Sequence, residues 1–319
     1  MREYLILGVI AGLWIGGVCW ADPSVAIVTH REFQAVDASG EQTYKAIQKV
    51  VLEGIVLHHP ADMQDPTPDD TITTPFNLGA QWQLFFQGEG DDHAGTAIYL
   101  AQLYDNLPWV ETGGYSNEAF IAELARLNAA RFSPGDRIRV TGWFLSYKGK
   151  MNINEQHNKN PDHDFIIELL EPDVGLPKPE VVSLDELKDD QDRGIFDAER
   201  LVGGEYYQGR LIKIEDVNVV DPNGWGPNGG LVVTDGTRTL PVKLGRGNGI
   251  YRGSYNLVEP FDVIGILDQE STNLRSGYRL YVMNYDGNGH VLASYEHRMA
   301  DMPKSDPNAL ASSTGRANL

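Results

Sequence analysis

The sequence predicts a mainly β protein built from two small five-stranded barrels in tandem. Short β-rich runs alternate with turn residues, the same order of strands and loops occurs twice, and single glycines lie inside four of the predicted strands. The chain has 319 residues, of which 41% are hydrophobic. At roughly 100–200 residues per domain, this length suggests two domains, and the apolar content is sufficient for two hydrophobic cores.

Residues 1–21 have the layout of a secretory signal peptide. Arg2 precedes an apolar run from about Leu5 to Val18, and the small residue Ala21 ends the segment. The alternative is an uncleaved membrane anchor, although the run is shorter than the roughly 20 apolar residues that a spanning helix needs. We therefore expect a secreted or periplasmic protein that meets a membrane only through this segment, if it is not cleaved.

Charge and cysteine content exclude several classes of function. Lys and Arg number 26 against 45 Asp and Glu, which gives a net charge of −19. Such an acidic chain is an unfavourable partner for nucleic acid, although a local basic patch remains compatible with it. Cys19 is the only cysteine and lies in the predicted signal, so we expect neither a disulfide-linked partner nor thiol catalysis in the mature chain.

The first barrel is predicted within residues 41–171. Residues 116–130 place apolar side chains at helical spacing behind Ser116 or Asn117, either of which can cap a helix. This helix is expected between strands 3 and 4. The five predicted strands cover residues 46–58, 81–87, 96–103, 136–145 and 151–155, with a long polar loop at 60–80.

The second barrel is predicted within residues 205–295, where a glycine-rich link at 245–260 replaces the helix. Its strands are expected at 205–220, 231–234, 239–244, 261–267 and 278–285. Residues 172–204 read as a linker with a short helix, and residues 296–319 as a flexible tail.

Four glycines suggest the register of the repeat. Gly54 is paired with Gly209 and Gly142 with Gly265, because each pair lies in a similar β-rich context. Small barrels need sharp bends where a strand passes between sheet faces, and glycine permits them. Five strands with a helix between the third and fourth describe an OB-fold. The alternative is a pair of other all-β domains, such as sandwiches.

These glycines, together with residues 134–142 (PGDRIRVTG) and 233–237 (VTDGT), resemble exported bacterial tandem OB-fold modules. Modules of this kind are attached to secreted nucleases and occur in multidomain surface proteins. The resemblance covers about three quarters of the chain. In the nucleases it implies that the chemistry resides in a separate phosphodiesterase domain, and no stretch of this chain is left over to supply one.

The sequence offers no nucleophilic catalytic set and only weak metal candidates. No Gly-x-Ser-x-Gly motif occurs. Imidazole and carboxylate groups suit zinc, but adjacent histidines on a strand point to opposite faces, and solvated polar loops explain both histidine groups as well. These groups are His58, His59 and Asp62, and His157, Asp162, His163 and Asp164.

A partial calcium-loop pattern occupies Asn284, Asp286 and Asn288, with Gly289 at the sixth position. The twelfth position holds Tyr295 instead of an acid, so a tight β-hairpin turn is the favoured interpretation. We therefore expect no cofactor, with calcium as the one candidate.

OB barrels bind ligands on the face of their second and third strands, between the first loop and the loop that joins strands 4 and 5. Aromatic and basic side chains there can stack on nucleic-acid bases or on sugar rings, or can simply pack the barrel mouth. Trp82 belongs to this set only if its side chain faces outward. The candidates are Trp82, Tyr147, Lys148, Lys150, Asn152, Asn154, Trp225 and Arg275.

The sequence thus favours an exported, non-catalytic binding protein that recognises a polymer, either nucleic acid or glycan, or a protein partner. One alternative is a metal-dependent hydrolase or phosphodiesterase that uses His157 and His163. Another is a calcium-stabilised surface module.

Overall fold

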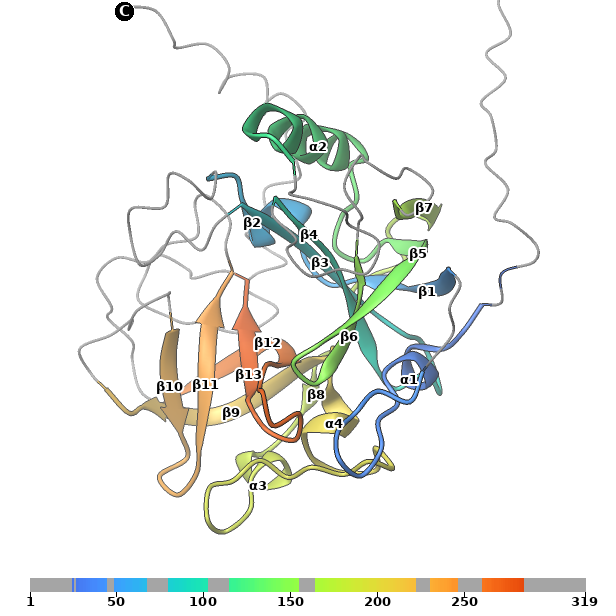
Figure 1. The fold of residues 1–319 in the computed structure, drawn as a ribbon. Coiled ribbons are helices and arrows are strands. Elements are labelled where there is room, and N and C mark those ends of the chain that lie inside the picture. Colours follow the sequence, from blue (N-terminus) through green and yellow to red (C-terminus); the bar gives the residue numbers. More distant parts are fainter. Residues whose placement is uncertain are drawn as a thin grey trace, which may run out of the picture.

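Two closed five-stranded β-barrels form the body of the protein (Figure 1). The computed structural model describes residue 25 and residues 27–44, 49–67, 80–102, 115–154, 164–221, 230–245 and 260–283. The first barrel has the strand order β1-β3-β4-β6-β5 and closes through β1 and β5. Its strands are β1 (Val50–Val56), β3 (Gln81–Gln87), β4 (Gly95–Ala101), β5 (Arg137–Tyr147) and β6 (Lys150–Asn154).

The second barrel repeats this topology. Its order is β9-β10-β11-β13-β12, and it closes through β12 and β9. In both barrels the third and fifth barrel strands pair in parallel and all other neighbours are antiparallel, so the predicted pair of OB-fold-like barrels is confirmed. The strands are β9 (Leu211–Val219), β10 (Gly230–Thr234), β11 (Thr239–Leu244), β12 (Phe261–Gln269) and β13 (Tyr278–Val282).

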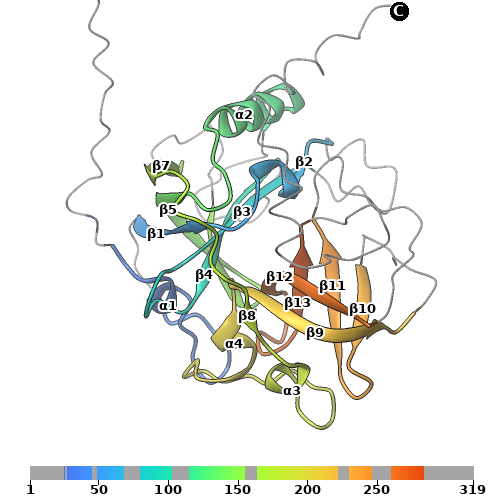
Figure 2. The ribbon, with the colours of Figure 1, turned by 180° about the vertical axis from the view of Figure 1, so that it is seen from behind.

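Several short elements accompany the barrels, and of these the sequence predicted only a short helix within residues 172–204, where α3 lies. Strand β2 pairs with β3, β7 extends the first sheet beside β5, and β8 lies parallel to β9. Thus β8, from the stretch read as a linker, belongs to the second sheet, and β8 and α4 lie between the barrels (Figure 2). These elements are α1 (His30–Phe33), η1 (Pro60–Met63), β2 (Gln64–Asp65), β7 (Ile166–Glu171), β8 (Glu180–Val181), α3 (Leu184–Leu187) and α4 (Gly203–Tyr207).

Helix α2 (Asn117–Ala129) lies over one end of the first barrel (Figure 1). The side chain of Ser116 caps it by accepting a hydrogen bond from the Ala119 amide, as the sequence predicted. Its buried side chains, Phe120, Leu124 and Leu127, join the core of the first barrel. The helix follows β4, which is the third strand of the barrel but the fourth strand in chain order, because the two-residue strand β2 precedes β3.

The glycine register is confirmed at one pair. Gly142 in β5 faces Val50, and Gly265 in β12 faces Ile212. Each glycine lies where its strand changes partner. From the next residue onward, β5 pairs with β6 and β12 pairs with β13. A Cβ on Gly142 would lie 2.6 Å from Ile153 Cγ2, so the bend requires the missing side chain.

The pairing of Gly54 with Gly209 is wrong. Gly54 lies inside β1, whereas Gly209 precedes β9 with a φ of +77°. Helix α4 occupies the start of the predicted strand 205–220, so β9 begins later than predicted and Gly209 does not correspond to Gly54. The bend of β9 lies beside Asp216, a non-glycine residue at φ +54°, where the pairing of β9 with β12 shifts.

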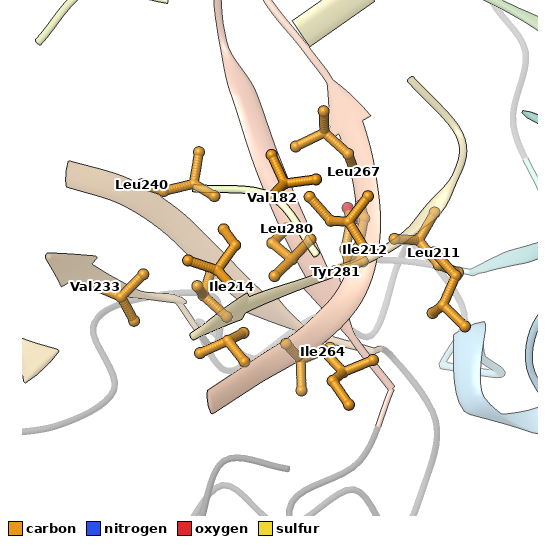
Figure 3. Close-up of a cluster of buried hydrophobic side chains, with 14 of the residues drawn as sticks. Val182, Leu211, Ile212, Ile214, Val233, Leu240, Ile264, Leu267, Leu280 and Tyr281 are labelled. Carbon is orange, nitrogen blue, oxygen red and sulfur yellow. The ribbon is translucent and has the colours of Figure 1, made fainter. Parts of the chain in front are cut away.

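One hydrophobic cluster extends across the junction between the barrels. Most of its members come from β9 to β13 (Figure 3), but Leu57, Met63, Phe85 and Ala97 belong to the first barrel and its loops. Phe85 and Tyr281 place their ring centroids 6.1 Å apart across this junction. The outer side of β3 and β4 is therefore packed against the second barrel.

The backbone contact between Gly95 and Gly209 predicts a position that cannot accept a side chain. We expect Gly209→Ala to destabilise the protein, because its Cβ would overlap the Gly95 carbonyl and φ is already positive. Gly236→Ala is the matched control, since its φ is +94° but no atom lies within 4 Å of the added Cβ. The control should cost about 1–2 kcal/mol, and Gly209→Ala a further ~1–3 kcal/mol in urea unfolding. Equal losses for the two variants would contradict the close contact.

Candidate functional site

The second barrel covers the face of the first barrel on which the sequence placed a ligand. The Gly95 amide donates to the Gln208 carbonyl at 3.0 Å, and the Leu211 amide donates to Gln87 Oε1 at 3.0 Å. Because β3 and β4 bond to the second barrel and the segment before it through these groups, this face of the first barrel is an internal interface.

A buried network of charges crosses the same interface. Lys150 of β6 pairs with Asp268 of β12, with side-chain exposures of 7% and 2%. The second oxygen of Asp268 accepts from Arg279 Nε at 3.1 Å, and Asp268 and Arg279 are direct cross-strand neighbours. Lys148 pairs with Glu270 at 2.7 Å. Although burial acts to raise the pKa of Glu270, Arg279 and Lys148 hold it at about 2.

Most candidates on the first barrel are therefore not available to a ligand. Trp82 does not face outward, because its side chain is fully buried in the first core. Lys150 is 6% exposed because it meets the second barrel, and Asn152 and Asn154, on the same side of β6, are 4% and 1% exposed. Tyr147 remains 43% exposed.

A buried polar triad lies beside this interface. Arg200 Nη1 donates to Glu205 Oε2 at 3.0 Å and to the Gln34 carbonyl at 3.1 Å, and the Tyr278 hydroxyl donates to Glu205 Oε1 at 2.8 Å. Burial raises the pKa of Glu205 to about 7, although Arg200 and the Tyr278 hydroxyl act to lower it. The carboxyl group therefore titrates near neutral pH inside the protein.

The equivalent face of the second barrel is open. Strands β10 and β11 direct Leu231, Val233, Leu240 and Val242 into the core, so the alternate residues face outward. The outward set comprises Val232, Thr234, Thr239, Pro241 and Lys243. Val232 is 37% exposed and lies opposite Pro241.

A cleft of about 820 Å³ adjoins this open face. One wall is the linker loop, which we define as residues 188–196, and the other is residues 273–277 between β12 and β13. Pro241 and Tyr278 line the cleft between these walls, and Arg275, one of the predicted binding residues, lies exposed on its second wall.

The described residues do not assemble a metal centre. No group of three or more His, Cys, Asp or Glu side chains is placed to hold an ion in that part of the chain. His58 Nε2 accepts from the Phe85 amide at 3.0 Å, and His59 and Asp62 cap η1, so these groups serve the fold. Burial, with Glu123 adding to it, raises the pKa of Asp164 to about 6.

The remaining candidates lie outside the described residues. They are Trp225 from the binding set, His157, Asp162 and His163 from the metal group, and Asn284, Asp286 and Asn288 from the calcium pattern. The signal segment at 1–21 and the tail at 296–319 also lie outside them. No helix in the described part of the chain is long and apolar enough to cross a membrane.

Comparison of the chain with protein-family models, with curated proteins and with solved structures finds no match. The interpretation of the site therefore depends on its geometry alone.

Sequence reasoning missed the interface and one wall of the cleft. A signal for the interface was available, because Asp268 directly follows the apolar end of the predicted strand 261–267 and Arg279 lies near the start of the predicted strand 278–285. A charge in a buried strand needs a partner, so the two could have been paired. The linker loop gave no such signal, because its charged residues are typical of a solvated connection.

The interface network predicts a large effect of a single charge. Asp268→Asn leaves Lys150 buried without its anion and leaves Arg279 with Glu270 as its remaining carboxylate, so we expect it to cost about 3–5 kcal/mol of unfolding free energy. Asp190→Asn is the control, because Asp190 pairs with Arg238 at 3.0 Å but its side chain is 97% exposed. Chemical denaturation should show no measurable loss for the control. A small loss for Asp268→Asn would contradict a desolvated network.

The polar triad predicts that stability depends on pH through Glu205. Its pKa rises from 4.5 to about 7 on folding, so its contribution is complete below pH 4.5 and is lost as the pH rises through 7. Relative to Glu205→Gln, the wild-type protein should therefore lose unfolding free energy between pH 5 and pH 8. Glu199→Gln, an exposed neighbour, should track the wild type. Parallel curves for wild type and Glu205→Gln would refute the assignment.

Proposed function

We propose that this chain is a non-catalytic binding protein that recognises its ligand on the outer face of β10 and β11. The observation that carries the proposal is the contrast between the two barrels. The face of β3 and β4 is buried against the second barrel, whereas the equivalent face of β10 and β11 remains exposed. An OB-type barrel uses this face for its ligands, so the second barrel is the binding barrel.

The open face combines apolar and polar side chains, which suits a ligand with both kinds of surface. Val232 and Pro241 form an apolar pair in its centre, and Lys243 supplies a charged group beside them. The hydroxyls of Thr234 and Thr239 already donate to the Arg238 carbonyl and to Asp192. Arg275 adds a second basic group from the neighbouring loop, and Trp225, from the first loop of this barrel, stays a predicted contact. The ligand classes proposed are a polymer, either nucleic acid or glycan, or a protein partner.

Export is part of the proposal. The layout of residues 1–21 supports it, and so does the absence of cysteine after Cys19, because such a chain needs no thiol protection in an oxidising compartment. We therefore propose a secreted or periplasmic location, on the basis of the signal-peptide layout of residues 1–21.

A binding screen with matched variants tests the proposed face. Mature protein is titrated with glycans and single-stranded nucleic acids to find a ligand that binds. We expect Val232→Asp to lower the affinity for that ligand at least about tenfold, because the substitution places a charge in the apolar centre of the face. Ile166→Asp on β7 is the control, since that side chain is 44% exposed on the first barrel. Equal losses in both variants, or turnover of the ligand, would contradict the proposal.

The ionic strength of the same screen separates the ligand classes. Affinity for nucleic acid should fall steeply with added salt, because phosphate binding releases counterions. Affinity for a neutral glycan should change little.

A further inference from the structure

We propose that the cleft between the linker loop and residues 273–277 is a binding site for a small organic acid, with a carboxylate head and an apolar body. This site goes beyond the proposed polymer contact, because its ligand is small and because, of the described residues, only Pro241 and Arg275 are shared with that contact. The cleft volume, about 820 Å³, lies in the range that small-molecule sites occupy.

The side-chain acceptors on both walls of the cleft are already used. Asp189 accepts four hydrogen bonds, from the amides of Gln191 and Arg193 and from the Arg193 guanidinium. Asp192 accepts from Lys188 and from the amide and hydroxyl of Thr239. A ligand that must donate hydrogen bonds to side chains, such as a polyol, therefore finds little to bind on this wall.

The opposite wall offers donors. Asn273 Oδ1 accepts from the Arg275 amide at 3.0 Å and from the hydroxyls of Ser271 and Ser276 at 3.2 and 2.8 Å, which leaves its amide nitrogen to donate. No described residue accepts from the guanidinium of Arg275, although this side chain is exposed at the cleft. A planar guanidinium fits a carboxylate through two parallel hydrogen bonds.

Apolar surface lies between these polar groups. Ile195, Phe196 and Pro241 line the cleft together with the ring of Tyr278. Ile195 and Phe196 are half-buried, so each exposes part of its side chain. This arrangement suits a ligand whose apolar body packs against these side chains while its charged end reaches Arg275.

Contacts within the protein hold Tyr278 and the linker loop in place. The Tyr278 ring is held between Gly194 and Gly204, at each of which a Cβ would approach the ring to 3.0 Å or less, and its hydroxyl donates to Glu205. The linker loop is tied to β11 through Asp192 and Thr239. Binding therefore costs little ordering of the walls.

The cationic groups at the cleft favour a ligand with a single carboxylate. Arg275 alone can neutralise one carboxylate, whereas a dianionic phosphate would keep an uncompensated charge in the field of a protein with a net charge of −19. Arg193 adds nothing to this balance, since it is already bidentate to Asp189.

Titration of the mature protein with 4-phenylbutyrate tests the site, and 4-phenyl-1-butanol is the matched neutral probe. We expect saturable binding of the acid, shifts of the Gly194 and Gly277 amide resonances in NMR spectra, and affinity for the alcohol at least about tenfold weaker, because it lacks the charge-assisted bonds. Absence of saturable binding by the acid, or equal binding of both probes, would overturn the assignment.

Two variants locate the binding. Arg275→Gln should lower the affinity for 4-phenylbutyrate at least about tenfold. Arg131→Gln, on an exposed arginine beyond the end of α2, should leave it unchanged. Unchanged affinity in Arg275→Gln, or amide resonance shifts confined to residues outside the cleft, would place the ligand elsewhere and overturn the assignment. The result does not depend on polymer binding, so failure of either proposal is seen separately.

Discussion

The docking of the two barrels is the constraint on which the rest of the structure depends. Gly95 and Gly209 bring the backbone of β4 into contact with the segment that precedes β9, and the buried pair of Lys150 and Asp268 lies across the same interface. Hydrophobic area alone could be buried in many relative orientations. A buried ion pair is satisfied in few of them, so it fixes the orientation at which the apolar cluster closes.

This docking gives the two barrels different roles despite their shared topology. The first barrel contributes Phe85 and Ala97 on the outer side of its second and third strands, and these side chains enter the core of the second barrel. The corresponding strands of the second barrel present Val232 and Pro241 to solvent. The same topology thus packs this face against a neighbour in the first barrel and leaves it exposed in the second.

Periodicity and turn residues predicted most of the architecture, because they report local geometry. Residues 81–87 were predicted as a strand with the observed bounds, and the helix cap is Ser116, one of the two predicted candidates. The short helix α4 escaped because its residues, GGEYY, contain two glycines and two aromatic residues that disfavour a helix, and tertiary contacts override that preference. Burial of Lys150 was equally hidden, since nothing in its own strand shows that a second barrel would cover it.

A single strand connects docking to the candidate sites. Successive side chains of a strand point to opposite faces, and at the start of β13 this separates Tyr278 from Arg279. Arg279 joins the ion network between the barrels, whereas the Tyr278 ring lines the cleft and its hydroxyl meets Glu205. A displacement of β13 that broke the network would therefore also move a wall of the cleft. The interface that covers the outer face of β3 and β4 is thus linked through β13 to a wall of the cleft.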